Sequence, residues 1–227
     1  MKPIIIIPAR GGSKRIPKKN IIDINGKPAI GILIEKLLDF KLANQVIVST
    51  DDTEITSIAE SYGAKVKSRS NLKLSNDYTP SEEVIRDFLG QDKTISENQP
   101  VFCIYPLAVL LKKSYLEEAL GIFEKFSNEF VICASILNPN PLRHSFFLDE
   151  KSVKVLFPQF NEKRSQDLVD VYYDAGLFYL ASKSVWLNEY KYWYTGNSKA
   201  VIVPTEDSID VDTLSDLNKL KQRLTEI

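Results

Sequence analysis

A cluster of basic residues near the amino terminus is the part of the sequence best suited to chemistry. Residues 10–19 read RGGSKRIPKK and carry five cations and no anion. Gly11 and Gly12 allow positive φ angles and let backbone amides approach a ligand closely. Amides surrounded by arginine and lysine form a binding site for a polyphosphate. The segment therefore predicts a phosphate cradle, and the alternative is a basic loop that water solvates.

This segment differs from the two common nucleotide-binding loops. It lacks the Gly-x-x-x-x-Gly-Lys-Ser/Thr pattern of a P-loop, and it is not the fingerprint of a dinucleotide-binding domain. It directly follows Ile4 to Ile7, a continuous β-branched run that is typical of a strand buried on both faces. Because ligands of parallel α/β sheets bind beyond the carboxyl ends of the strands, this position favours the cradle over the solvated loop.

Two aspartates late in the sequence have a spacing that suits a metal ion. Asp210 and Asp212 alternate with Ile209 and Val211, so an extended segment would place both carboxylates on one face and both apolar side chains on the other. Mg²⁺ usually takes one or two carboxylates together with phosphate oxygens and water. The spacing alone leaves a second interpretation equally open, in which Asp212 or Thr213 caps the last helix.

Strand-like and helix-like segments alternate through the first part of the chain and must position these groups. Strands are predicted at 4–7, 46–49, 101–105 and 130–136, with amphipathic stripes between them. Capping boxes predict helix starts at Thr79–Glu82 and Ser114–Glu117. The pattern predicts an α/β fold, with a Rossmann-like, mostly parallel sheet flanked by helices. The spacing of four leucines predicts a last helix near the end of the sequence; they are Leu214, Leu217, Leu220 and Leu224.

The stretch from about 138 to 170 interrupts the alternation. We interpret it as a small β-rich excursion inserted into a single domain that spans 1–227. The excursion is too short to bury a core of its own, and apolar groups at such density usually mark an interface. A two-fold homodimer is the commonest solution, and the alternative is that the side chains fold back onto their own sheet. They are Phe146, Phe147, Leu148, Val153, Val155, Leu156, Phe157 and Phe160.

The composition argues against several classes of protein. The net charge is −1, without the basic excess of a nucleic-acid binder. No apolar run is long enough for a membrane span or a signal peptide, so we expect a cytoplasmic protein that contacts neither nucleic acid nor membrane. Cys103 and Cys133 lie in apolar runs and are interpreted as reduced core thiols. With His144 as the one histidine, a zinc site or catalytic triad is not indicated.

The basic segment also carries a family resemblance. The sequence IIPARGGSKRIPKKN at 6–20 resembles the signature of the acylneuraminate cytidylyltransferases, which activate acidic sugars with CTP. The similarity extends over nearly the whole chain, through VSTDD at 48–52, Arg69 with LSND at 74–77, CIYP at 103–106 and IDVDT at 209–213. The segments KRSQDL at 163–168 and YYDAGLFYL at 172–180 are most similar to the pseudaminate branch of that family.

The resemblance implies a fold, a reaction and partners. The fold would be of the nucleotide-diphospho-sugar transferase type, with the excursion serving dimerisation. The reaction would transfer CMP from CTP to an acidic nine-carbon sugar similar to pseudaminate and release pyrophosphate. The alternatives are the same chemistry on legionaminate, N-acetylneuraminate or 3-deoxy-manno-octulosonate. Mg²⁺ is the implied cofactor, and a homodimer is the implied assembly.

The resemblance also implies roles for individual residues. The catalytic positions are Arg10, Lys14, Lys19, Asp210 and Asp212, and the last two would bind the metal. The nucleotide-binding positions are Ala9, Arg10, Gly11, Gly12, Ser13, Lys19, Asn20, Arg69, Asp77 and Pro106. The sugar-binding positions are Tyr105, Arg164, Gln166 and Asp174. A guanidinium such as that of Arg164 suits a sugar carboxylate, although Arg164 could instead form a surface ion pair with Asp167.

Two positions depart from the pattern of the pseudaminate branch. Leu107-Ala108-Val109 stands where that branch usually has Thr-Ala-Pro, and Tyr173 stands where it often has histidine. Leu107 thus replaces a hydroxyl near the expected nucleotide and sugar. The departure at 107–109 motivates an alternative of another class, a catalytically weak protein that binds nucleotide sugars.

Overall fold

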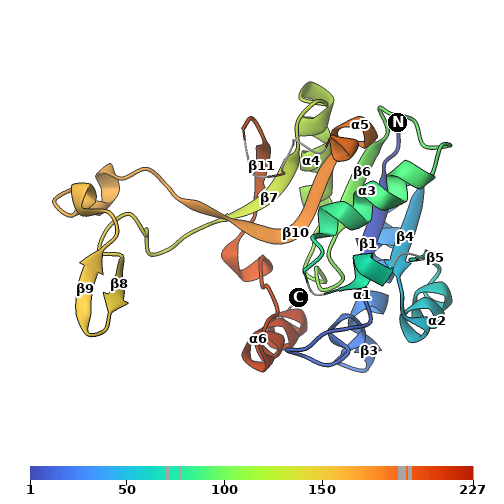
Figure 1. Cartoon of the computed structure of the whole chain (residues 1–227), viewed down its shortest axis with the longest axis horizontal. Helices are drawn as coiled ribbons and strands as arrows, with labels where there is room; N and C mark the ends of the chain where they lie inside the picture. Colours follow the sequence, from blue (N-terminus) through green and yellow to red (C-terminus); the bar gives the residue numbers. More distant parts are fainter. Residues whose placement is uncertain (70–71, 77, 189–192, 194–195, 227) are drawn as a thin grey trace.

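A seven-stranded sheet lies at the centre of the computed structural model, which describes residues 1–226 apart from 70–71, 77, 189–192 and 194–195 (Figure 1). Its strands are β1 (Ile4–Pro8), β4 (Gln45–Thr50), β5 (Lys65–Ser68), β6 (Pro100–Ile104), β7 (Val131–Ile136), β10 (Tyr172–Ser182) and β11 (Lys199–Ile202). Their order is β11-β7-β10-β6-β1-β4-β5. Only β10 runs antiparallel to its neighbours, so the other six strands share one direction.

Helices cover both faces of this sheet. Ile5 and Ile7 of β1 pack into one core layer and Ile4 and Ile6 into the other, as expected for a strand buried on both sides. The first layer includes α1 (Ala29–Phe40), α2 (Thr53–Ser61), α4 (Lys113–Lys125) and α6 (Leu214–Thr225), and the second includes α3 (Ser81–Gln91) and α5 (Lys183–Leu187). A short hairpin of β2 (Asp23–Ile24) and β3 (Lys27–Pro28) precedes α1.

The predicted α/β fold is confirmed, and the strands expected at 4–7, 46–49, 101–105 and 130–136 correspond to β1, β4, β6 and β7. None of the helices in the described part of the chain combines the length and the apolarity that a membrane crossing needs.

Helices α3 and α4 begin close to the predicted starts, but neither predicted capping box forms. Helix α3 begins one residue after Pro80, and the side chain of Asn76 accepts hydrogen bonds from the amides of Tyr78 and Thr79 instead. Helix α4 begins at Lys113, so Ser114 lies inside it, and no side chain caps either helix. Local turns therefore overrode the capping pattern.

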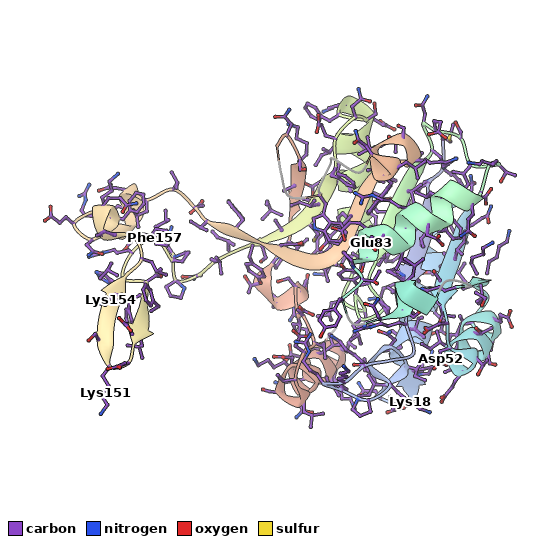
Figure 2. All side chains as sticks on the ribbon, viewed as in Figure 1. Lys18, Asp52, Glu83, Lys151, Lys154 and Phe157 are labelled. Carbon is purple, nitrogen blue, oxygen red and sulfur yellow. The ribbon has the colours of Figure 1, made fainter. Side chains whose placement is uncertain are left out.

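Residues 137–171 form an arm that extends away from the rest of the chain (Figure 1). Its hairpin pairs β8 (Phe146–Asp149) with β9 (Ser152–Val155), and every residue of both strands is exposed. Phe147 is 54% exposed and Leu148 63%. The apolar side chains of this hairpin therefore do not fold back onto the central sheet in the single chain. Figure 2 shows Phe157, Lys154 and Lys151 on this arm, far from Asp52 and Lys18.

The packing of α1 against the end of α2 provides a test of the fold. A Cβ on Gly31 would lie within 3.0 Å of the Tyr62 ring, whereas a Cβ on Gly121 in α4 would meet nothing within 4 Å. We expect Gly31→Ala to destabilise the protein by about 1–3 kcal/mol through overpacking. Gly121→Ala, the matched control, should stabilise it by about 0.5–1 kcal/mol. Urea unfolding measures both, and a Gly31→Ala variant at least as stable as the wild type would contradict the packing.

Candidate active site

A cavity of about 300 Å³ lies at the carboxyl edge of the sheet, where β1 and β6 end side by side. After β1 the chain continues to β4 on one side, and after β6 it continues to β7 on the other side. The carboxyl ends of parallel strands at such a switch point form the usual ligand crevice of α/β folds. The sequence-predicted residues can therefore be placed by their position relative to this cavity.

Much of the basic segment lines the cavity. Arg10, Gly12, Ser13, Lys19 and Asn20 all border it. The Asn20 side-chain amide donates to the Arg10 carbonyl oxygen at 2.9 Å, and the Arg10 guanidinium donates to the Asn76 carbonyl oxygen at 2.7 Å. These bonds fix the curved path of the segment, and its cations Arg10, Arg15 and Lys19 all line the cavity.

Gly11 and Ala9 support the cradle from behind. The Gly11 amide donates to an Asp51 carboxylate oxygen at 3.0 Å, and a Cβ at this position would collide with Asp52. Ala9 is fully buried, and its amide donates to the Ser49 carbonyl oxygen at 2.9 Å. Neither residue lines the cavity, so in this structure Gly11 is needed for close packing against the start of α2. Lys14 is exposed and lies outside the cavity lining.

Arg69 forms part of the cavity wall and holds the wall together. Its guanidinium donates to the Ser49 carbonyl oxygen at 2.9 Å and to the Leu74 carbonyl oxygen at 3.1 Å. Burial lowers the pKa of Arg69, although the group stays cationic at neutral pH. Arg69 thus ties the end of β4 to the turn that carries Asn76. Asp77, the other predicted nucleotide contact here, lies outside the described residues.

Asp210 and Asp212 arrive from the far end of the chain. Asp210 lines the cavity together with Ile209 and Val211, whereas Asp212 is not among the lining residues. Val211 is 1% exposed, as the alternating pattern predicts for an apolar position. Asp212 accepts from Lys19 at 3.2 Å and from Arg15 at 2.5 Å. Desolvation by the surrounding cavity wall, and then repulsion from Asp212, raise the pKa of Asp210. Two carboxylates that repel each other beside a basic cradle form a donor set suited to a hard cation such as Mg²⁺.

The helix-cap interpretation of this segment is also correct in part. Thr213 is the N-cap of α6 and forms a capping box with Asp216. The Asp212 amide also donates to Asp216, at 3.3 Å, while the Asp212 carboxylate is paired with Lys19 and Arg15 and does not cap the helix. Among the described residues, no group of three or more His, Cys, Asp or Glu side chains could hold a metal ion. A metal here would therefore need ligands from a substrate as well.

The opposite side of the cavity is formed by the residues that follow β6 and by the middle of β10. Tyr105, Pro106, Leu107 and Leu177 all line it. Asp174 does not, because its carboxylate accepts from the Gly176 amide at 2.9 Å and from the Tyr179 hydroxyl at 2.6 Å. The pairing of β10 with β7 shifts in register between Asp174 and Tyr179. The two bonds of Asp174 stabilise this shift, which presents Leu177 to the cavity.

Arg164 and Gln166 lie far from this cavity, on the arm. The guanidinium of Arg164 donates to Asp167 at 2.8 Å, which is the surface ion pair that the sequence left open. Gln166 lies in the adjacent 3₁₀ turn, Ser165–Asp167, and is exposed. Within a single chain, neither residue borders the cavity.

Sequence reasoning missed several residues of the cavity wall. Arg15 was counted among the cations, but nothing in the pattern distinguished it from Lys14 or Lys18. Ser81 and Val84 face the cavity from the first turns of α3, where they read as ordinary helix residues. Leu107 was noticed as a departure, and the structure places it in the wall.

The remaining chemical candidates of the sequence are structural. Cys103 and Cys133 are fully buried, and burial raises the pKa of the Cys133 thiol to about 12. Both are therefore unreactive core thiols, as predicted. His144 is exposed on the arm.

Comparison with known proteins assigns the chain to a family. The cytidylyltransferase family model matches residues 4–157. The chain belongs to the cytidylyltransferase family. Among curated relatives, pseudaminic acid cytidylyltransferase of Campylobacter jejuni subsp. jejuni serotype O:2 is 38% identical over 225 residues, which are 97% of this chain and 95% of that protein. N-acylneuraminate cytidylyltransferase of Streptococcus agalactiae serotype V is 30% identical over 218 residues, 95% of this chain and 52% of that one.

Solved structures support the fold of this cytidylyltransferase. A CMP:2-keto-3-deoxy-manno-octonic acid synthetase complexed with CTP has a TM-score of 0.73 at 16% identity, and the match covers 100% of this chain and 99% of that one. A 4-diphosphocytidyl-2C-methyl-D-erythritol synthase from Anaerococcus prevotii has a TM-score of 0.66 at 16% identity, with 99% of each chain covered. The predictions of family and fold are confirmed.

The raised pKa of Asp210 gives a test of the carboxylate pair. We expect Asp212→Asn to lower the pKa of Asp210, because the change removes a nearby negative charge and releases Lys19 and Arg15 from their ion pairs. NMR titration of ¹³C-labelled carboxyl groups measures this pKa. Glu54→Gln is the control, since it removes a carboxylate that pairs with Lys18, and it should leave the value unchanged. An unchanged or higher Asp210 pKa in Asp212→Asn would show that the two carboxylates do not share one site.

Proposed function

We propose that this cytidylyltransferase transfers CMP from CTP to an acidic nine-carbon sugar similar to pseudaminate and releases pyrophosphate. The observation that carries the proposal is the meeting of Arg10, Lys19 and Asp210 around one cavity. A basic cradle and a carboxylate from distant parts of the chain suit a triphosphate with its metal ion. The names and high coverage of the C. jejuni relatives support the choice of sugar.

The proposed reaction is an in-line displacement at the α-phosphorus. The anomeric hydroxyl oxygen of the sugar forms a bond to the α-phosphorus as the bond to the bridging oxygen of pyrophosphate breaks, and the hydroxyl proton is released to solvent. Arg10, Arg15 and Lys19 would bind the phosphates and neutralise charge that builds on the oxygens. Mg²⁺ held by Asp210 and Asp212 would add positive charge at the phosphates and lower the pKa of the hydroxyl.

The ion pairs of Asp212 suggest how the cations of the cradle are balanced within the protein. Lys19 and Arg15 both contact Asp212 in the structure. Phosphate oxygens are strong alternative partners for the same two cations. CTP binding would therefore compete for Lys19 and Arg15 and make the Asp212 carboxylate available to the metal.

The identity of the sugar depends on the wall beside β6 and β10. Leu107 and Leu177 present apolar groups there, and Tyr105 lines the same cavity. A wall without the expected hydroxyl at 107 favours a sugar with apolar substituents at that point. The same chemistry on legionaminate, N-acetylneuraminate or 3-deoxy-manno-octulosonate is the alternative. The intact cradle and carboxylate pair favour an enzyme over a weak binding protein.

A pyrophosphate-release assay tests the function. With CTP and Mg²⁺, we expect turnover on pseudaminate to exceed turnover on the other three acidic sugars, and CTP to be preferred over UTP and ATP. Asp212→Asn should lower the rate by about two orders of magnitude or more, because it removes charge from the metal site without changing its shape. Circular dichroism checks that the variant is folded. Tight CTP binding without turnover on any sugar would favour the binding protein instead.

We also propose that the arm forms a homodimer. An isolated two-stranded hairpin is marginally stable in water, and this one exposes apolar side chains on both faces. A second copy of the chain could cover them and place Arg164 and Gln166 at the neighbouring sugar site.

Reduced thiols and a net charge of −1 support a cytoplasmic location without nucleic-acid partners.

Light scattering tests the assembly. We expect a dimer at micromolar concentration. We expect Leu148→Asp to dissociate it, because Leu148 is 63% exposed in the single chain and the proposed dimer would bury the new charge at this position. Lys151→Asp, at the tip of the same hairpin (Figure 2), is the control and should stay dimeric. A wild-type monomer with full activity would contradict the proposal.

A further inference from the structure

We propose that Tyr173 is a positioning residue for the metal-binding carboxylates and acts through a hydrogen bond to Ser208. The inference rests on the proposed function, in which Asp210 and Asp212 bind the metal. Tyr173 is the second residue of β10, and Ser208 precedes Asp210 by two positions. The two oxygens are 2.7 Å apart, and Ser208 is only 6% exposed.

The direction of this hydrogen bond follows from the partners of Ser208. The serine hydroxyl donates its one proton to the Thr205 carbonyl oxygen at 3.1 Å. The Tyr173 hydroxyl must therefore be the donor to the Ser208 oxygen. Tyr173→Phe removes this donor and keeps the aromatic ring, which makes it the smallest change that breaks the link.

The segment around Asp210 is anchored on both sides of Ser208. Upstream, the side chain of Asp207 is completely buried and accepts from Tyr115 and Lys112, each at 2.5 Å. Downstream, the capping box of Thr213 and Asp216 fixes the start of α6. Both anchors attach the segment to helices.

Strands β7 and β10 provide a second attachment. Ser135 of β7 donates to the Val203 carbonyl oxygen at 3.0 Å, and Tyr173 lies opposite Ser135 in the sheet. Among the hydrogen bonds that the structure describes for residues 208–212, the bond from Tyr173 is the one that comes from the sheet. It therefore links the sheet edge by a hydrogen bond to the segment whose residues 209–211 line the cavity.

Metal binding is sensitive to such a link. Mg²⁺ demands near-ideal octahedral geometry, so its ligands must be held in place before it binds. One hydrogen bond corresponds to a factor of about 3–10 in an equilibrium constant. We expect Tyr173→Phe to weaken metal binding by about that factor. Partners that contact a metal ligand directly have larger effects, of about 10–100-fold.

The test measures Mn²⁺ binding by EPR in the presence of CTP and without sugar. Tyr173→Phe should raise the dissociation constant for Mn²⁺ about 3–10-fold while the affinity for metal-free CTP and the melting temperature stay near wild-type values. Tyr172→Phe is the matched control, since this neighbouring tyrosine is 45% exposed, and it should bind Mn²⁺ like the wild type. The Mg²⁺ concentration for half-maximal pyrophosphate release should shift by the same factor.

A double-mutant cycle identifies the route. Ser208→Ala should weaken Mn²⁺ binding, and Tyr173→Phe should add little in that background because the two residues act through one bond. Wild-type Mn²⁺ affinity in Tyr173→Phe, or fully additive effects of the two changes, would overturn the inference. A wild-type protein that binds no Mn²⁺ at all would instead refute the metal site of the proposed function.

Discussion

Parallel pairing of β1 with both β4 and β6 is the constraint on which the rest of this structure depends. Because Ile4 to Ile7 are buried on both faces, β1 lies in the interior of the sheet, between β6 and β4. Strands that share a direction end at the same edge, so the segments after β1, β4, β5 and β6 emerge together. The cradle after β1 is thereby brought next to Arg69 and Tyr105, which are distant in sequence.

Electrostatics then determines what that edge can bind. Asp51 and Asp212 accept hydrogen bonds from Gly11 and Lys19, so the basic segment is partly neutralised before any ligand arrives. Desolvation, and then repulsion from Asp212, raise the pKa of Asp210, while Lys19 and Arg15 oppose this rise. A site with partners of both signs suits a ligand that also carries both, such as a triphosphate with a divalent cation. A free anion would repel the carboxylates, and a free cation would repel the cradle.

The sequence was informative where a pattern reports a local property. Four β-branched residues predicted the central strand, and alternation around Val211 predicted the exposed face of Asp210, because burial dictates both. The capping boxes failed because the Asn76 turn and an earlier start of α4 took precedence. The packing role of Gly11 and the bond from Tyr173 to Ser208 join residues far apart in the chain, and no local pattern reports such contacts. The density of apolar residues on the arm was visible, but its extension away from the sheet was not.

The most direct test of the account is a crystal structure of the protein with CTP and Mg²⁺. The account predicts a triphosphate within hydrogen-bonding distance of Arg10 and Lys19, and a metal ion bound by Asp210 and Asp212 as well as by phosphate oxygens. It also predicts that Lys19 no longer pairs with Asp212. A nucleotide bound away from the carboxyl ends of β1 and β6, or a metal ion without either aspartate among its ligands, would contradict the central claim.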